Sequence, residues 1–217
     1  SLDAWVRLHY VFPYPHVDEI IPLMAQGKVL PYLDIPFQHG SPSVLKRMKR
    51  PAFAENTLAR IRRWREICPD ITIRSTFIVG FPGETDADFE DTMRIVRDVR
   101  YAQAFSFKYS PRPGTPGATM DGHVEESAKS ERLQRLQALL GEQQAAFMKS
   151  LEGQEIAVLL EKPGRDAGQL VGRSPWLQPV ICDETVGKIG DSVTVRIERA
   201  SANSLISSEA ANRRRAA

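Results

Sequence analysis

Two short polar segments follow apolar runs, and their residue types could bind a small polar ligand. The first is Gln38–Ser41, which places an amide, an imidazole and a hydroxyl after the apolar run "YLDIPF". The second is Gly80–Glu84, which places two glycines, a proline and a carboxylate after "TFIV". Glycines let a backbone approach a flat ligand closely, and a helix N-terminus favours carboxylates and anionic ligands. Ordinary turn chemistry is the competing interpretation of both segments, because serine, proline and acidic residues also begin helices.

Neither segment is specific by itself. The stretch "GFPGE" has neither the dinucleotide-binding nor the P-loop glycine spacing, and a lone histidine such as His39 is more often structural than catalytic. The two cysteines, Cys68 and Cys182, are far apart, so they form no cysteine-spaced metal motif and no disulfide framework. This cysteine usage is typical of a reducing compartment and predicts a cytoplasmic protein. Two polar strand ends in one sheet would nevertheless favour a genuine binding site.

The elements that must position these segments alternate between strands and helices. Apolar runs predict strands at residues 5–11, 30–37, 71–79 and 102–109. Helical spacing predicts helices at residues 17–26, 53–67, 86–99 and, as one long helix with an apolar stripe, 125–151. Strands that alternate with helices and are apolar throughout predict a parallel sheet with crossover helices. Because such sheets bind ligands at the carboxyl ends of their strands, both polar segments should lie at one edge.

The pattern changes near Gly153. Beyond it, five short apolar segments are separated by glycine, proline and acidic turns, which predicts a small closed β-barrel. We therefore expect an α/β domain with its long helix over residues 1–152, a barrel over residues 153–209 and a basic tail over residues 210–217. The predicted fold class is α/β followed by a small all-β barrel.

Charge and hydropathy narrow the classes of partner. The 217 residues carry a formal net charge of +2, and no apolar run reaches the roughly 20 residues that span a bilayer, so no membrane partner is expected. From Gly153 to the end there are nine basic and eight acidic residues. Composition therefore gives no case for nucleic acid.

Individual basic residues have a simple interpretation. Lys162, Arg165 and Arg173 fall in or beside early loops of the predicted barrel and could form one face, although a solvated surface is the simpler reading. The tail residues Arg213–Arg215 could add nonspecific, salt-sensitive phosphate contacts. We interpret Arg132 and Arg135 as the solvent-facing side of the long helix.

Several motifs together resemble a known family. The stretches "YLDIPFQHGSPSVLKRMKR", "FIVGFPGET" and "FSFKYSPRPGTPGA" closely resemble the radical S-adenosylmethionine (SAM) methylthiotransferases. The resemblance continues through "LVGRSP" and "GDSVTVRI" into the small RNA-binding barrel, the TRAM domain, that ends those enzymes. It implies the C-terminal part of a (β/α) radical SAM barrel followed by a TRAM barrel.

The resemblance implies an activity with two branches. Enzymes of this family insert a sulfur and a methyl group into an unreactive C–H bond, either in a hypermodified adenosine beside the tRNA anticodon or in an aspartate of a small-subunit ribosomal protein. Residues 12–39 look more like the ribosomal-protein branch, and the chain from Gly83 onward looks more like the tRNA branch. We take the tRNA branch as the main prediction because that half includes the barrel. The ribosomal-protein branch is the alternative, and a non-catalytic RNA-binding remnant is the second.

The resemblance also implies site residues and partners. It places Gly80, Phe81 and Glu84 beside the adenosyl part of SAM, and Gln38 and Ser41 near its ribose and methionine parts. Lys108 is expected at the rim of the same site, and Lys162, Arg165 and Arg173 become candidates for RNA contact. The implied partners are tRNA, or a ribosomal protein in the alternative, and an electron donor for the full enzyme.

The sequence departs from the family in its cysteines. The family chemistry requires a CxxxCxxC loop that carries a 4Fe–4S cluster, and three further upstream cysteines for an auxiliary cluster. Neither set is present in these 217 residues. We therefore assign no catalytic or metal-binding residue and expect the chain alone to be inactive. The chain starts within its first predicted strand and without Met, so we expect it to be a fragment.

Overall fold

The computed structural model describes residues 4–50 and 54–208. The chain divides into two compact units, Ser1–Gln143 and Gln144–Ala217. The boundary falls within the helix α6, Glu126–Ser150, which contributes residues to both units.

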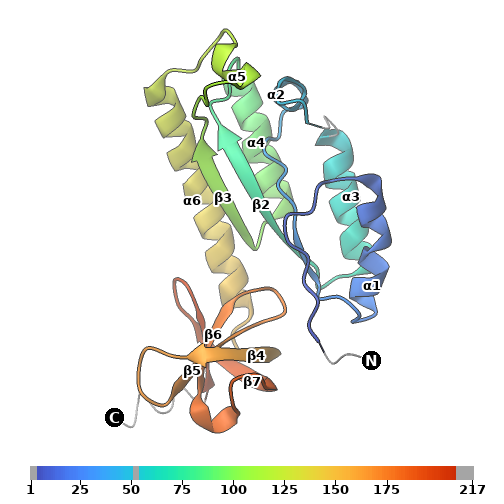
Figure 1. The fold of residues 1–217 in the computed structure, drawn as a ribbon, viewed down its shortest axis with the longest axis vertical. Helices are drawn as coiled ribbons and strands as arrows, with labels where there is room; N and C mark the ends of the chain where they lie inside the picture. The colour runs from blue at the N-terminus through green and yellow to red at the C-terminus, as the bar shows by residue number, and fades with distance from the viewer. Residues whose placement is uncertain (1–3, 51–53, 209–217) are drawn as a thin grey trace. The chain divides into compact units, whose positions relative to one another are not determined.

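The first unit is built on a parallel sheet of three strands in the order β1-β2-β3 (Figure 1). Its strands are β1 (Tyr32–Asp34), β2 (Thr72–Val79) and β3 (Gln103–Lys108). Its helical elements other than α6 are η1 (Pro15–Glu19), α1 (Ile21–Ala25), α2 (Pro42–Arg47), α3 (Ala54–Ile67), α4 (Asp86–Val99) and α5 (Pro116–Thr119). The α3 helix joins β1 to β2 and α4 joins β2 to β3, which is the crossover pattern that parallel strands require.

Alternating burial along β2 shows that the two faces of the sheet differ. Ile73, Phe77 and Val79 are buried in one hydrophobic core with side chains of α1, α3, α4 and α6. Arg74, Thr76 and Ile78, which point to the other face of the sheet, are half-buried. On β3, the rings of Phe105 and Phe107 remain 41% and 55% exposed. Helices therefore cover one face of the sheet, while the other keeps exposed aromatic side chains.

Three predicted elements differ from the observed ones, and prolines explain two of these differences. The run 30–37 gives a strand of only three residues because Pro31 and Pro36 flank it and cannot donate to the ladder. The predicted helix 17–26 is split into η1 and α1 because Pro22 lacks the amide hydrogen that a continuous helix would use. The predicted strand at residues 5–11 is wrong, since within it only Leu8 forms an isolated bridge, to Leu33.

The second unit contains a closed barrel with the strand order β4-β5-β6-β8-β7. Its strands are β4 (Glu155–Pro163), β5 (Gln169–Arg173), β6 (Pro179–Asp183), β7 (Ser192–Ala200) and β8 (Leu205–Ser207), with a short 3-10 turn η2 (Glu184–Val186). Val158, Val180 and Ile197 are fully buried in its core. The predicted fold class, α/β with a parallel sheet followed by a small closed barrel, is confirmed. The predicted basic tail, residues 210–217, lies outside the described residues.

Among the described helices, none is long and apolar enough to cross a membrane.

Candidate functional site

The carboxylate of Glu84 organises the glycine turn that follows β2. Glu84 Oε2 accepts hydrogen bonds from the backbone N–H of Gly80 at 2.7 Å and of Phe81 at 3.3 Å. The same oxygen lies 3.1 Å from His39 Nε2, and the side chains of Glu84 and His39 are both fully buried. Because a buried carboxylate needs hydrogen-bond donors, the turn and the end of the first strand are held together through this one group.

The protonation pattern of His39 follows from its other nitrogen. His39 Nδ1 accepts the backbone N–H of Ser41 at 2.9 Å, so the ring proton is on Nε2 and is donated to Glu84. The backbone N–H of Gly40 donates to Thr92 Oγ1 on α4 at 2.9 Å. Both ring nitrogens are thus engaged within the protein, which gives His39 a structural role and agrees with the interpretation of a lone histidine.

The counterion of Glu84 comes from the long helix. Arg132 Nη1 lies 3.0 Å from Glu84 Oε1, and Arg132 Nη2 lies 2.7 Å from Asp86 Oδ1. Arg132 is only 7% exposed, so its prediction as a solvent-facing residue is wrong. The error has a physical cause: the partner carboxylate lies 48 residues away in sequence, where no helical spacing can reveal it. Arg135, in contrast, is exposed and pairs with Glu90 at the surface.

The side chain of Ser41 takes part in capping a helix and does not line the pocket described below. Its hydroxyl donates to Asp88 Oδ1, as does that of Ser43, while Thr85 and Asp88 form a reciprocal capping box on α4. Burial alone would raise the pKa of Asp88, but the hydrogen bonds from Ser41, Ser43 and Thr85 outweigh it. The pKa of this carboxyl is therefore held well below its ordinary value.

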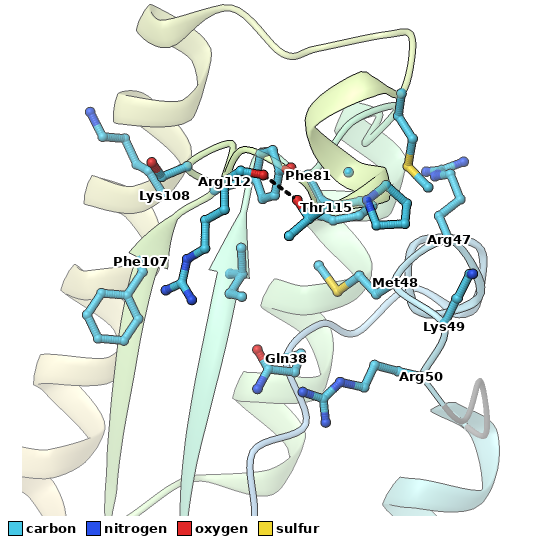
Figure 2. Close-up of a pocket in the computed structure, with 16 residues that line it drawn as sticks. Gln38, Arg47, Met48, Lys49, Arg50, Phe81, Phe107, Lys108, Arg112 and Thr115 are labelled. Atoms are coloured by element: carbon cyan, nitrogen blue, oxygen red, sulfur yellow. Dashed lines mark hydrogen bonds between the residues drawn. The ribbon is translucent and has the colours of Figure 1, made fainter.

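A pocket of about 610 Å³ lies at the carboxyl ends of the three strands (Figure 2). It is lined by the residue that ends the β1 segment, by the end of α2, by the last residues of β2 and β3, and by the β3–α5 loop with α5. The lining residues are Gln38, Arg47, Met48, Lys49, Arg50, Ile78, Phe81, Phe107, Lys108, Tyr109, Ser110, Arg112, Thr115, Pro116, Gly117 and Met120. Such volumes and positions are typical of small-molecule sites in parallel α/β folds.

The structure brings three of the six predicted SAM residues to this pocket. Gln38, Phe81 and Lys108 line it, whereas Ser41, Gly80 and Glu84 do not. The Lys108 side chain points away from the pocket in Figure 2, and its ammonium bonds to Glu126 and Ser130 on α6. Lys129 also pairs with Glu126. The hydrogen bonds from Lys108 and Lys129 together lower the pKa of Glu126 to about 2. Lys108 thus borders the pocket while its charge is used elsewhere.

Gln38 has an unusual backbone conformation. Its φ of 72° lies in the left-handed region, which a residue with a side chain seldom adopts. Two backbone hydrogen bonds to β2 hold it there, from Gln38 N to Thr76 O at 2.9 Å and from Ile78 N to Gln38 O at 2.8 Å. Such strain is found most often at functional sites, where the surrounding structure imposes it.

Sequence reasoning missed the basic side chains of the pocket. Arg47 ends α2, Lys49 and Arg50 follow that helix directly, and Arg112 comes from the β3–α5 loop. The signal was visible as "KRMKR" after a short helix and as "PRPGTPG" after a strand. The second segment follows the carboxyl end of a strand, where parallel α/β folds place their ligands, but the first follows the end of a helix, so topology alone does not place the two together.

The predicted RNA contacts lie on the hairpin formed by β4 and β5. Lys162 and Arg165 are exposed, and Arg173 is half-buried. Arg173 Nη1 donates to Leu177 O at 3.1 Å, and its Nε lies 3.5 Å from Glu161 Oε2. The guanidinium of Arg173 is therefore partly committed within the barrel.

Neither cysteine lies in a metal-binding group. Cys68 and Cys182 are both buried, and burial raises the pKa of the Cys68 thiol. Across residues 4–50 and 54–208, no group of three or more His, Cys, Asp or Glu side chains is placed to hold a metal ion.

Comparison with known proteins agrees with this architecture. Residues 2–96 match the radical SAM superfamily, and residues 149–208 match the TRAM domain. These matches and the fold together indicate part of a radical SAM domain followed by a TRAM domain. Over 196 residues, 90% of its length, the chain is 53% identical to the curated "Ribosomal protein uS12 methylthiotransferase RimO" of Bordetella petrii. The chain spans 44% of the length of that relative.

The chain belongs to the radical SAM methylthiotransferase family, as its motifs predicted. The name of the matched relative agrees with the ribosomal-protein alternative and not with the tRNA branch that we preferred from the sequence.

Proposed function

We propose that this chain is part of a methylthiotransferase that modifies a ribosomal protein, and that the pocket at the carboxyl ends of the strands is its SAM site. The observation that carries the proposal is this pocket, with Gln38 and Phe81 in its wall, in a chain 53% identical to a curated ribosomal-protein methylthiotransferase. The ribosomal-protein branch replaces tRNA as the preferred substrate class. An aspartate side chain remains the modified group, as the family resemblance implies.

The chemistry of the pocket fits SAM. Met48, Ile78 and Phe81 offer an apolar surface for a purine ring, and the amide of Gln38 can donate to and accept from ribose hydroxyls. The hydroxyl of Tyr109 is buried and has no hydrogen-bond partner among the described residues, so a polar ligand group would satisfy it. When bound, SAM supplies the methyl group and, with a reduced iron–sulfur cluster, the means to activate an unreactive C–H bond.

Glu84 has an indirect role in this proposal. Its carboxylate fixes the backbone of Gly80 and Phe81, and Phe81 packs edge-on against Tyr109 with ring centroids 4.9 Å apart. The buried network of His39, Glu84 and Arg132 thereby holds the aromatic wall of the pocket in place. Glu84 is a positioning residue and not a direct ligand of SAM.

The iron–sulfur clusters would be held by residues outside this chain. A CxxxCxxC loop needs three closely spaced cysteines, whereas the chain has only Cys68 and Cys182, which are far apart in sequence. We propose that the chain alone does not transfer a methylthio group. Anaerobic incubation with iron and sulfide should give no cluster absorption, and stoichiometric 4Fe–4S formation would contradict this statement.

The barrel is proposed to contact RNA through Lys162, Arg165 and Arg173. The match to the TRAM domain, a small RNA-binding barrel, supports this proposal. The side chains of Lys162 and Arg165 are exposed, so both can contact phosphate groups. Binding of a short RNA should weaken steeply as salt rises, because each neutralised phosphate releases counterions.

Binding of S-adenosylhomocysteine to the full chain tests the SAM site. We expect Gln38→Ala to weaken binding by about tenfold, since a buried ligand hydroxyl would lose its partner. Gln137→Ala is the matched control, because Gln137 is exposed on α6 and lies outside the pocket lining. Equal affinity of the two variants, or no binding by the unaltered chain, would remove the SAM assignment.

A further inference from the structure

The pocket is strongly cationic. Five of the residues that line it are basic, namely Arg47, Lys49, Arg50, Lys108 and Arg112, and none of the lining residues is acidic. A cleft with charges of one sign and apolar walls concentrates ligands of the opposite charge. SAM carries a single carboxylate beside its positive sulfonium and ammonium groups, so the proposed cofactor accounts for only part of this positive charge.

Two of these cations are already used within the protein. Arg47 Nη2 donates to Gly83 O at 2.7 Å and lies 3.7 Å from Asp88 Oδ2. Lys108 bonds to Glu126 on α6. Both side chains therefore stabilise the walls of the pocket, and their charges are not available to bind a ligand.

The guanidinium groups of Arg50 and Arg112 are available. Within the part of the chain that the structure describes, neither has a hydrogen bond or an ion pair, and Arg50 only lies over the ring of Phe12 at 5.4 Å from its centroid. Figure 2 shows the two side chains on opposite sides of Gln38: Arg50 extends toward Gln38, and Arg112 extends from its loop into the space between Phe107 and Gln38. They come from different segments, the end of α2 and the β3–α5 loop, and meet at one pocket.

Two guanidinium groups that line one pocket from opposite sides of Gln38 can bind one planar anion together. Arginine binds carboxylates with two parallel hydrogen bonds, which adds geometric selectivity to charge attraction. A nucleic-acid strand carries a charge on every nucleotide and is bound by cations spread along a groove. Two unpaired arginines in one pocket, and not a row of cations along a groove, therefore favour a single carboxylate over an RNA backbone.

We propose that Arg50 and Arg112 form a clamp for one carboxylate group at this pocket. The inference rests on the proposed function, which offers two sources of that carboxylate. One is the amino-acid end of SAM, and the other is the acidic side chain of a peptide substrate. In this proposal Arg50 and Arg112 select the ligand, and tight binding requires a negative charge on that ligand.

Two pairs of probes, in each of which one member has the carboxylate and the other lacks it, test the clamp and identify its source. S-adenosylhomocysteine is compared with 5′-methylthioadenosine, which lacks the amino-acid end. A short peptide with one central aspartate is compared with its asparagine counterpart. Dissociation constants are measured by titration calorimetry on the full chain, on Arg50→Gln and Arg112→Gln, and on the control Arg94→Gln, whose arginine pairs with Asp91 on the surface of α4.

We expect at least one carboxylate probe to bind about tenfold or more tightly than its partner. Arg50→Gln and Arg112→Gln should each remove most of that preference, while Arg94→Gln keeps it and binding of the carboxylate-free probe is unchanged. Dependence seen with the nucleoside pair identifies the methionyl carboxylate, and dependence seen with the peptide pair identifies the substrate acid. Arg50 is half-buried and Arg112 is exposed, so the variants should fold, which a thermal melt checks.

Three results would overturn the clamp: no preference within either pair, equal losses for both members of a pair, or loss of binding only for a short RNA. Failure of the proposed function looks different. If both nucleosides bind equally and the peptides do not bind, the SAM site stands and the clamp falls. If neither nucleoside binds but the aspartate peptide binds through both arginines, the SAM site falls and the clamp stands.

Discussion

The two units of this chain handle buried polar groups and strand edges in different ways. The first unit buries the charged or ionisable side chains of His39, Glu84 and Arg132 beside its pocket. The core of the second unit is apolar, and its buried Asp183 caps the short η2 turn by accepting from Thr185. In the barrel every strand has two neighbours, whereas β1 and β3 each have one within the described sheet.

This difference separates a unit whose interior serves stability alone from a unit whose buried charges hold a pocket in shape. A closed barrel satisfies its own backbone and needs no charged interior to define its shape. The first unit instead uses a buried ion pair to hold a glycine turn at the rim of a pocket, although such a pair is a weak source of net stability. We infer that the pair is kept for the geometry of the turn, and the following variants test that view.

The largest effect is expected when the buried pair loses one partner. Arg132→Met leaves Glu84 buried without its counterion, and we expect the first unit to lose about 3–5 kcal/mol of unfolding free energy. The barrel should be unaffected because its core contains no residue of this network. Hydrogen exchange followed by mass spectrometry, peptide by peptide, measures the two units separately within the intact chain.

Arg135→Met is the matched control for this variant. Arg135 lies on the same helix, but its pair with Glu90 is half-exposed, so its loss should cost no more than about 1 kcal/mol. Similar exchange rates in the two variants would mean that the Glu84 network does not hold the first unit together. Faster exchange in the barrel peptides of Arg132→Met would mean that the units unfold as one.

Each unit also contains one glycine that backbone packing requires, and this allows a symmetrical test. A Cβ added at Gly40 would lie 2.5 Å from Thr92 Cα on α4, and one added at Gly172 would lie 2.5 Å from Leu159 O on β4. Because backbone atoms cannot move aside easily, each alanine variant should destabilise its own unit by about 1–3 kcal/mol. Gly40→Ala should speed exchange in the first unit only, and Gly172→Ala in the barrel only.

Gly141→Ala controls for the loss of a glycine as such. No heavy atom lies within 4 Å of a Cβ added at Gly141, which sits within α6. Alanine there should stabilise the first unit by about 0.5–1 kcal/mol through helix propensity. Destabilisation by this variant would show that an effect other than close packing governs the glycine positions.

Elements whose bounds are set by a local sequence pattern were predicted correctly. Elements whose bounds are set by prolines, or by contacts with residues far away in the sequence, were not. The helix at residues 86–99 was predicted at its observed bounds because a capping box and an apolar stripe both lie within it. The strand at residues 30–37 was too long because apolar character outweighed Pro31 and Pro36 in the prediction. The barrel was predictable because turn residues separate its strands at short intervals.

The site was predictable only in part for a related reason. Topology alone places Gln38 and Phe81 at one edge of the sheet, where both line the pocket. No local pattern can tell that Glu84 faces inward to His39 and Arg132, since those partners lie 45 and 48 residues away. Arg112 was missed because a loop gives no periodicity from which to infer the direction of a side chain.

A smaller effect, which depends on pH, is expected at Asp88. The pKa of Asp88 is lowered in the folded protein, so its hydrogen bonds contribute stability above the ordinary carboxyl pKa of about 4. That contribution is lost as the pH falls below about 4 toward the lowered pKa. Asp88→Asn should therefore cost the first unit about 1–2 kcal/mol at pH 7 and progressively less in acid.

Urea unfolding of both proteins between pH 2.5 and pH 7 measures this difference. Asp121→Asn is a suitable control, because Asp121 is an exposed carboxylate of the first unit. A constant difference between Asp88→Asn and the unaltered chain across this range would show that the charge of Asp88 adds nothing to the cap.

The smallest change in stability, and the sharpest link between strain and function, is expected at Gln38. Its φ of 72° suits glycine better than glutamine, so Gln38→Gly should not destabilise the first unit and should gain up to about 1 kcal/mol. The same variant removes the amide from the pocket and should weaken S-adenosylhomocysteine binding by about tenfold. Gain in stability with loss of binding would mark Gln38 as a residue kept for its ligand, whereas loss of both would mean that its side chain supports the fold.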